Sequence, residues 1–206
     1  MHETGAEQGK VPSGLRWQDL VTATASKKLE AYRRILSGLG DNDRNVDQAI
    51  VKIFHGAATV LREAKNLQML IEAISKLDWF SEGKDSFGDL YEGLLQKNAE
   101  ETKRGAGQYF TPRPVIEVMV RLIQPQPDDV IQDPAAGTGG FLVLAHQHVR
   151  AINAGRKKGR RTLIFSGMEN VQDTFRLLLM NLYLHGIDAS NVHLGDTLSD
   201  DHRNLI

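Results

Sequence analysis

A short glycine-rich segment, set between a strand pattern and a helix pattern, constrains this chain more than any other feature. The apolar pair Val130-Ile131 leads into Asp133-Pro134-Ala135-Ala136-Gly137-Thr138-Gly139-Gly140-Phe141, and a helical pattern follows. Glycines allow a tight turn and a close approach of backbone to ligand, and the start of a helix offers free N–H groups. The segment predicts a ligand-binding turn in an α/β sheet, with an ordinary strand-to-helix turn as the alternative.

The residues of this turn argue against two common phosphate-binding motifs. No Gly-Lys-Ser/Thr follows, as a P-loop requires, and the spacing differs from the Gly-x-Gly-x-x-Gly of dinucleotide folds. Instead, an acidic residue, Asp133, stands at the start of the glycine turn. A carboxylate there suits a ligand with an amino group at that point. S-adenosylmethionine (SAM) is a ligand of that kind.

Two further strand patterns follow the turn. Leu163-Ile164-Phe165 begins a strand that ends near Glu169, and 192–194 is a third short strand ending at Gly195-Asp196. Helical patterns separate these strands. One runs from Phe141 to about Val149, and the other has a start signal at Asn170 and an end at Gly186. Strand, helix, strand, helix, strand predicts a parallel α/β sheet.

A second motif, Gly107-Gln108-Tyr109-Phe110-Thr111-Pro112-Arg113-Pro114, precedes the glycine turn by about 20 residues. Taken alone it is a helix start, because proline is tolerated in the first turn of a helix. The helix is expected to run through Ile123, where Pro125-Gln126-Pro127 stops it.

The part of the chain before this motif is expected to be helical. Apolar residues recur at spacings of three and four in several stripes, including Leu29-Tyr32-Leu36-Leu39 and a longer one from Val60 to Leu77. We predict a flexible tail over 1–14, a helical N-terminal domain over 15–104 and an α/β part over 105–206.

Composition excludes several classes of protein. The chain has no cysteine, so it holds neither a disulfide framework nor a zinc-thiolate site. Its net charge of −1 lacks the basic excess of a nucleic-acid-binding tail. No apolar run approaches the roughly 18 residues of a membrane span, and no signal core precedes Gly14. We expect a cytoplasmic protein with no membrane association and no metal site.

The two motifs, together with Gly167-Met168-Glu169, resemble the modification (M) subunit of type I restriction-modification systems, a family of N6-adenine DNA methyltransferases. Phe87-Gly88-Asp89-Leu90-Tyr91-Glu92-Gly93-Leu94-Leu95 resembles the end of that family's N-terminal helical domain. The resemblance covers roughly residues 15–206. It implies an α+α/β fold, in which a helical domain precedes the first part of a Rossmann-like methyltransferase sheet, truncated after its third strand.

The resemblance also implies site residues, with SAM as cofactor. The methionine end would be held by Gln108, Tyr109, Phe110, Thr111, Pro112 and Arg113. Asp133 would face the amino group, and the turn would line the cofactor through Pro134, Ala135, Gly137, Thr138, Gly139 and Gly140. Glu169 would accept hydrogen bonds from the ribose hydroxyls, and Asp196 would meet the adenine amino group. A helix-start carboxylate and a turn aspartate are the respective alternatives for these two acids.

The chain departs from the family in one respect that matters for catalysis. The family's Asn/Asp-Pro-Pro-aromatic motif has no counterpart here, because none of the six prolines adjoins another. We therefore assign no catalytic residue, and we expect an N-terminal fragment or a truncated reading frame. The basic run from Arg156 to Arg161 is expected to be a solvated loop, with contact to DNA phosphates as the alternative.

Three hypotheses remain open. The first is an enzyme part that works on DNA with a specificity subunit, a restriction subunit and, as a candidate, a second M subunit. The second is a catalytically inactive assembly or SAM-binding module. The third, a dehydrogenase-like nucleotide binder, leaves the segment 108–113 unexplained. We expect the isolated chain to be inactive.

Overall fold

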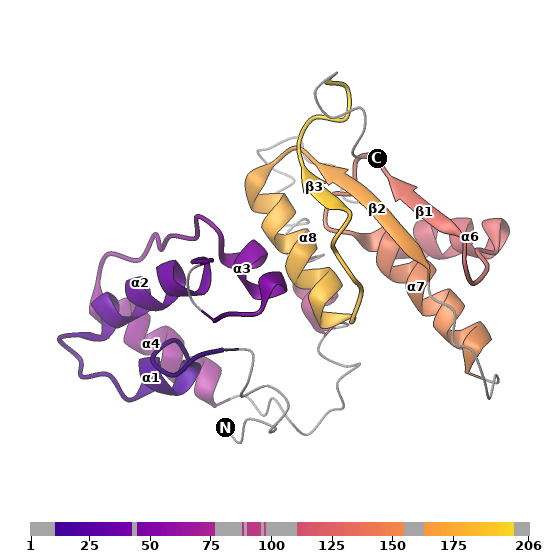
Figure 1. Ribbon diagram of the computed structural model, residues 1–206. Helices are drawn as coiled ribbons and strands as arrows, with labels where there is room; N and C mark the ends of the chain where they lie inside the picture. The colour runs from indigo at the N-terminus through magenta and orange to yellow at the C-terminus, as the bar shows by residue number, and fades with distance from the viewer. Residues whose placement is uncertain are drawn as a thin grey trace. The chain divides into compact units, whose positions relative to one another are not determined.

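The computed structural model of the chain describes residues 11–42, 45–76, 88, 90–95, 97, 111–154 and 163–199 (Figure 1). Contacts along the chain separate two compact units, Met1–Glu82 and Gly83–Ile206. In the described residues no helix has both the length and the apolar character needed to cross a membrane.

The first unit is helical, as predicted. It contains α1 (Trp17–Val21), α2 (Lys28–Leu39), α3 (Gln48–Phe54) and α4 (Ala64–Ser75). Before α1, the backbone N–H of Gly14 donates to Asp19 at 2.9 Å. Helix α2 packs against the other three helices, so it is the centre of this unit.

The buried face of α2 differs from the predicted stripe. Of the stripe residues only Leu39 is buried, and the buried face runs instead through Ala31, Ile35, Gly38 and Leu39. A Cβ added to Gly38 would come within 2.6 Å of the Leu15 side chain. Glycine therefore lets the chain approach this face closely, which apolar periodicity alone does not indicate.

Helix α4 begins later than the predicted stripe. Val60 is 92% exposed and residues 57–63 are not helical, so the interpretation of Val60 as part of a helical stripe was wrong. The hydroxyl of Thr59 accepts a hydrogen bond from the N–H of Leu61 at 3.1 Å. Such a local bond gives the backbone an alternative to helical hydrogen bonding. The predicted end of the stripe, Leu77, lies outside the described residues.

The second unit contains the predicted parallel sheet. Its elements are α6 (Arg113–Ile123), β1 (Val130–Asp133), α7 (Gly140–Asn153), β2 (Ile164–Glu169), α8 (Gln172–Leu184) and β3 (Val192–Leu194). The strand order is β1-β2-β3, and both pairs are parallel. In the register Asp133 lies beside Gly167, and Glu169 beside Leu194. The alternation predicted from sequence is confirmed.

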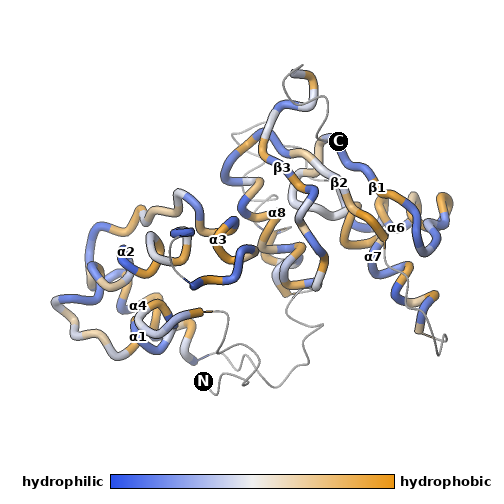
Figure 2. The backbone as a smooth tube through the Cα atoms, viewed as in Figure 1, coloured by the Kyte–Doolittle hydropathy of each residue, from blue (hydrophilic) through white to orange (hydrophobic). Residues whose placement is uncertain are grey.

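One apolar core holds α7 and α8 against the sheet. It includes Leu142 and Val143 of α7, Phe165 of β2 and Leu178 and Leu182 of α8, all nearly or fully buried. Figure 2 shows apolar and polar stretches alternating along α7, as expected for a helix buried on one side. Since both crossovers connect parallel neighbouring strands in one direction, right-handed connections place both helices on the same face.

Helix α6 packs on the other side of α7. Ile116 and Val120 of α6 contact Leu144, with Phe141 beside them. As predicted, prolines open this helix: Pro112 is its N-cap and Pro114 lies in its first turn. The helix ends at Ile123, as predicted, and its C-cap residue Gln124 has a left-handed conformation.

Residues 90–95 are helical and belong to the second unit. The carboxylate of Glu92 pairs with Arg113 at the start of α6, and Leu95 is buried. These contacts explain why the second unit begins before residue 105. The predicted limit at 104/105 lies outside the described residues, so the domain boundaries stay predictions.

Candidate functional site

Three carboxylates lie at the same edge of the parallel sheet. Asp133 is the last residue of β1, Glu169 is the last residue of β2, and Asp196 comes just after β3. Because the strands are parallel, their carboxyl ends meet at one edge (Figure 1). Open α/β sheets bind ligands outside these ends.

The glycine turn joins β1 to α7 at this edge. Gly137 has φ 55° and Gly139 has φ 87°, in the left-handed region that favours glycine. A Cβ added to Gly137 would meet nothing within 4 Å, whereas one added to Gly139 would lie 2.6 Å from Leu178. The turn is therefore open at Gly137 and closely packed at Gly139.

Glu169 holds the glycine turn. Its Oε2 accepts a hydrogen bond from the N–H of Gly137 at 2.9 Å, and its Oε1 accepts one from Val171 at 2.8 Å. The second bond lies just before α8, so the predicted alternative, a helix-start carboxylate, describes part of its role. Each carboxylate oxygen can accept more than one bond, so Glu169 retains capacity for a ligand.

Asp133 is half-buried at the start of the turn. Burial raises the pKa of its carboxyl above the ordinary value, a hydrogen bond from the Ala135 N–H lowers it, and the charge of Glu169 raises it. That bond measures 3.2 Å. A desolvated carboxylate beside a second one favours a cationic partner.

Asp196 is exposed, and its Oδ1 accepts a hydrogen bond from the N–H of Leu198 at 3.0 Å. The hydroxyl of the next residue, Thr197, donates to the carbonyl of Pro134. The loop after β3 is thus tied to the turn after β1. Pro134 and Ala135 are exposed on that turn.

Asn181 on α8 was not predicted as a site residue. The residue is 1% exposed, and its Nδ2 donates to the carbonyl of Thr138 at 2.9 Å. An amide among the apolar positions of α8 was the available signal, because buried polar groups need partners. Asn181 therefore holds the glycine turn through a buried hydrogen bond from α8.

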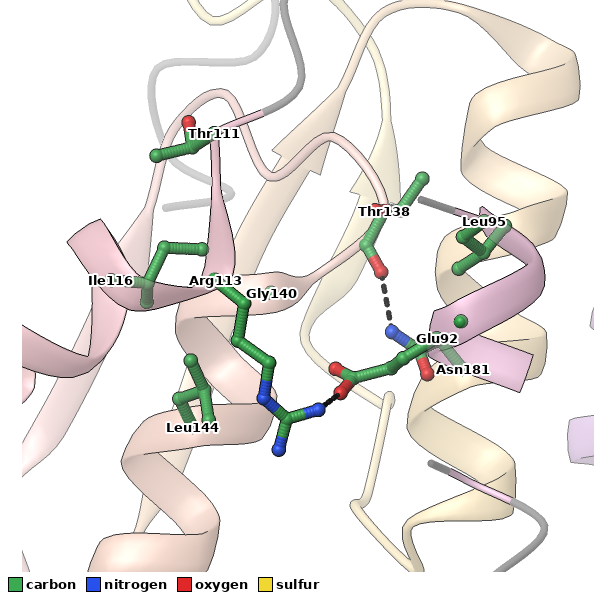
Figure 3. A pocket seen from close by; sticks show the side chains of 10 residues that line it. Glu92, Leu95, Thr111, Arg113, Ile116, Thr138, Gly140, Leu144 and Asn181 are labelled. Atoms are coloured by element: carbon green, nitrogen blue, oxygen red, sulfur yellow. Dashed lines mark hydrogen bonds and ion pairs between the residues drawn. The ribbon is translucent and has the colours of Figure 1, made fainter. Parts of the chain in front are cut away.

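A cavity of about 140 Å³ lies beside the turn (Figure 3). Its walls come from the helical residues 90–95, the start of α6, the turn with the start of α7, and α8. The lining residues are Glu92, Gly93, Leu95, Thr111, Arg113, Ile116, Thr138, Gly140, Leu144 and Asn181. The structure therefore brings part of the second motif, Thr111 and Arg113, to the same cavity as Thr138 and Gly140.

The structure describes the second motif from Thr111 onwards. Thr111 and Pro112 are exposed and precede α6. Gln108, Tyr109 and Phe110 lie outside the described residues. The Arg113 guanidinium contacts Glu92, and also Glu117 at 3.3 Å and Gln147 at 3.2 Å.

The chain is similar to proteins of one family. The family model described as N-6 DNA Methylase matches residues 82–205. The "Type I restriction enzyme EcoKI methylase subunit" of Escherichia coli (strain K12) is 42% identical over 219 residues, which cover 98% of this chain and 41% of the relative. The chain thus spans about two-fifths of the length of the curated relatives it matches first.

Solved structures share the fold. A chain from work on complex assembly and conformational transition of the type I R-M system is 27% identical, with a TM-score of 0.68 over 97% of this chain and 42% of that one. The type I restriction-modification system methyltransferase subunit from Streptococcus thermophilus reaches a TM-score of 0.72 at 22% identity, covering 95% of this chain and 42% of that one. The second similarity supports the fold alone.

Proposed function

Because the chain belongs to the N-6 DNA methylase family, we propose that it supplies the SAM-binding portion of a type I DNA methyltransferase that modifies adenine at N6. The observation that carries this proposal is the glycine turn, which is held by Glu169 and open at Gly137. A ligand can approach the backbone there without meeting a side chain.

The residues at the sheet edge fit the groups of SAM. Asp133, desolvated and beside another carboxylate, suits the α-ammonium group. Glu169 suits the ribose hydroxyls, because a carboxylate accepts from both hydroxyls of a cis-diol. Asp196 suits the adenine amino group. The resemblance assigns the methionine end to the segment Gln108–Arg113, and Thr111 of that segment lines the cavity beside Thr138 and Gly140.

The bound cofactor would supply an electrophilic methyl group on its sulfonium sulfur. This chain's residues would bind and orient the cofactor, and we assign no catalytic residue among them. The adenine must leave the DNA stack for its amino group to be reached. We propose that the whole methyltransferase acts in the cytoplasm on DNA with specificity and restriction subunits, and that a second M subunit is a candidate partner.

We also propose an alternative function, because the sequence has no adjacent prolines and so no Asn/Asp-Pro-Pro-aromatic motif. In this alternative, the chain is a SAM-binding or assembly module without catalysis. We expect no methyl incorporation into adenine when the purified chain is incubated with SAM and DNA alone. Incorporation under those conditions would contradict the alternative.

Calorimetric titration of SAM into the 206-residue chain tests cofactor binding directly. We expect saturable binding that Asp133→Ala abolishes. The matched control is Asp173→Ala, which removes an aspartate that is 90% exposed in the first turn of α8. A chain that is folded by circular dichroism but binds no SAM would overturn the proposed cofactor site.

A further inference from the structure

Arg113 joins three helical segments. It is the first residue of α6, and its guanidinium contacts Glu92 of residues 90–95, Gln147 of α7 at 3.2 Å and Glu117 of its own helix at 3.3 Å. Glu92 and Gln147 lie 21 and 34 positions away in the sequence. Figure 3 shows the guanidinium directed at the Glu92 carboxylate.

The pair with Glu92 is the more buried of the two ion pairs. The Glu92 side chain is 14% exposed, against 43% for Glu117. A guanidinium keeps its charge at any ordinary pH and binds a carboxylate in a fixed planar geometry. Salt and water screen a partly buried pair less than an exposed one. We therefore expect the Glu92 contact to determine where the Arg113 side chain lies.

The segments that these contacts join also line the cavity. Glu92, Gly93 and Leu95 form one wall, Thr111 and Ile116 flank Arg113, and α7 contributes Gly140 and Leu144. Each of these walls belongs to a segment that Arg113 joins or starts. Thr138 of the glycine turn and Asn181 of α8 border the same space. A change in the position of Arg113 would therefore change the cavity next to the turn.

We propose that Glu92 is a positioning residue: by holding Arg113, it sets the width of the cavity that takes the amino-acid end of the cofactor. The proposal rests on the cofactor site proposed above, and it gives Arg113 a role different from direct contact. Two carboxylates already surround the guanidinium, so the carboxylate of a ligand would have to displace one of them. Glu92 acts on the ligand through Arg113 and the cavity wall.

Two nucleosides that differ only at the amino-acid end provide the test. S-adenosylhomocysteine carries that end, and 5′-methylthioadenosine lacks it. We expect Glu92→Gln to reduce the affinity for S-adenosylhomocysteine by about tenfold, as for the loss of one charge-assisted contact. The affinity for 5′-methylthioadenosine should stay within about twofold of wild type. If Glu92 had only a structural role, the variant would lose affinity for both nucleosides or for neither. Unchanged S-adenosylhomocysteine binding would overturn the proposal.

Glu117→Gln is the matched control. It removes the carboxylate that Arg113 contacts within α6, while leaving the contacts between segments in place. We expect both nucleosides to bind this variant within about twofold of wild type, as for an exposed helix pair. Equal losses in the Glu117→Gln and Glu92→Gln variants would overturn the specific role of Glu92.

A double-mutant cycle separates positioning from direct contact. If Glu92 acts through Arg113, then Glu92→Gln, Arg113→Gln and the double variant should lose similar affinity for S-adenosylhomocysteine. A larger loss in Arg113→Gln than in Glu92→Gln would assign Arg113 to the ligand and overturn the proposal.

The same cycle in thermal unfolding needs no ligand. Non-additive shifts in the unfolding midpoint support the coupling of the pair, and additive shifts overturn it. A wild-type chain that binds neither nucleoside would overturn the proposed function and, with it, the role toward the cofactor. Wild-type binding that Glu92→Gln leaves unaltered would overturn only the positioning role.

Discussion

The carboxylate of Glu169 accepts a hydrogen bond from the backbone N–H of Gly137 at 2.9 Å, across 32 positions of sequence. The last residue of β2 thereby holds the turn that follows β1. The acid proposed to bind the ribose also organises the turn proposed to line the cofactor. Ligand binding and local stability should therefore change together at this residue.

Glu169→Ala tests this coupling. Hydrogen bonds to a charged group contribute about 1.5–3 kcal/mol, so we expect the unfolding midpoint to fall by about 3–12 °C in a chain of this size. SAM affinity should fall by at least about tenfold. Calorimetry measures both. In Asp173→Ala, where a 90% exposed carboxylate is lost, both should stay near wild type, and equal effects in the two variants would contradict this view of Glu169.

Asn181→Ala should lower stability by leaving the Thr138 carbonyl without its amide partner. An unsatisfied buried polar group costs about 1–3 kcal/mol, and the small side chain also leaves a cavity. Thermal unfolding measures the loss. Asn191→Ala, at an exposed position after α8, is the control and should unfold like wild type. A wild-type midpoint for Asn181→Ala would contradict the supporting role of its amide.

Asp133→Asn should stabilise the chain at neutral pH while it abolishes SAM binding. The pKa of Asp133 is raised, mainly by burial, so the folded chain binds this proton more tightly than the unfolded chain. The carboxyl contributes stability below the ordinary aspartate pKa, and that contribution is lost as pH rises through the raised value. Asparagine has no such loss.

Unfolding curves of wild type and Asp133→Asn between about pH 4 and pH 7 measure this difference. We expect the midpoint of the variant to exceed that of wild type at the upper end of this range and to approach it at the lower end. A constant difference across the range would show that Asp133 does not titrate differently in the folded chain.

The two left-handed glycines should respond differently to alanine. Gly139→Ala places a Cβ 2.6 Å from Leu178 and should destabilise the chain by more than Gly137→Ala, whose Cβ meets nothing within 4 Å. The left-handed backbone alone costs alanine about 1–2 kcal/mol at either position. Gly137→Ala should instead reduce SAM affinity, because its methyl group occupies the open side of the turn.

Unfolding midpoints and SAM titration of the two glycine variants check these expectations. Equal destabilisation of both variants would contradict the packing difference. Full SAM affinity in Gly137→Ala would mean that the ligand does not approach the turn at that residue.

The sequence by itself predicted the order of elements in the second unit and the acids at the strand ends. Those predictions depend on local patterns: apolar runs for strands, helical spacing for α7 and α8, and prolines at the start of α6. Interactions between near neighbours determine such elements, so the sequence carries their signal. In the first unit the helices were predicted, but two details differ. The hydrogen bond at Thr59 accompanies a later start of α4, and the close approach at Gly38 accompanies a different buried face of α2.

The tertiary structure alone decided how the site is held together. The partners of Thr138, Gly137 and Arg113 are Asn181, Glu169 and Glu92, which lie 43, 32 and 21 positions away. It also decided that Gly139 packs closely against Leu178 while Gly137 faces open space. Such contacts produce no periodic pattern in the sequence, because they form only when the sheet and its helices bring distant residues together.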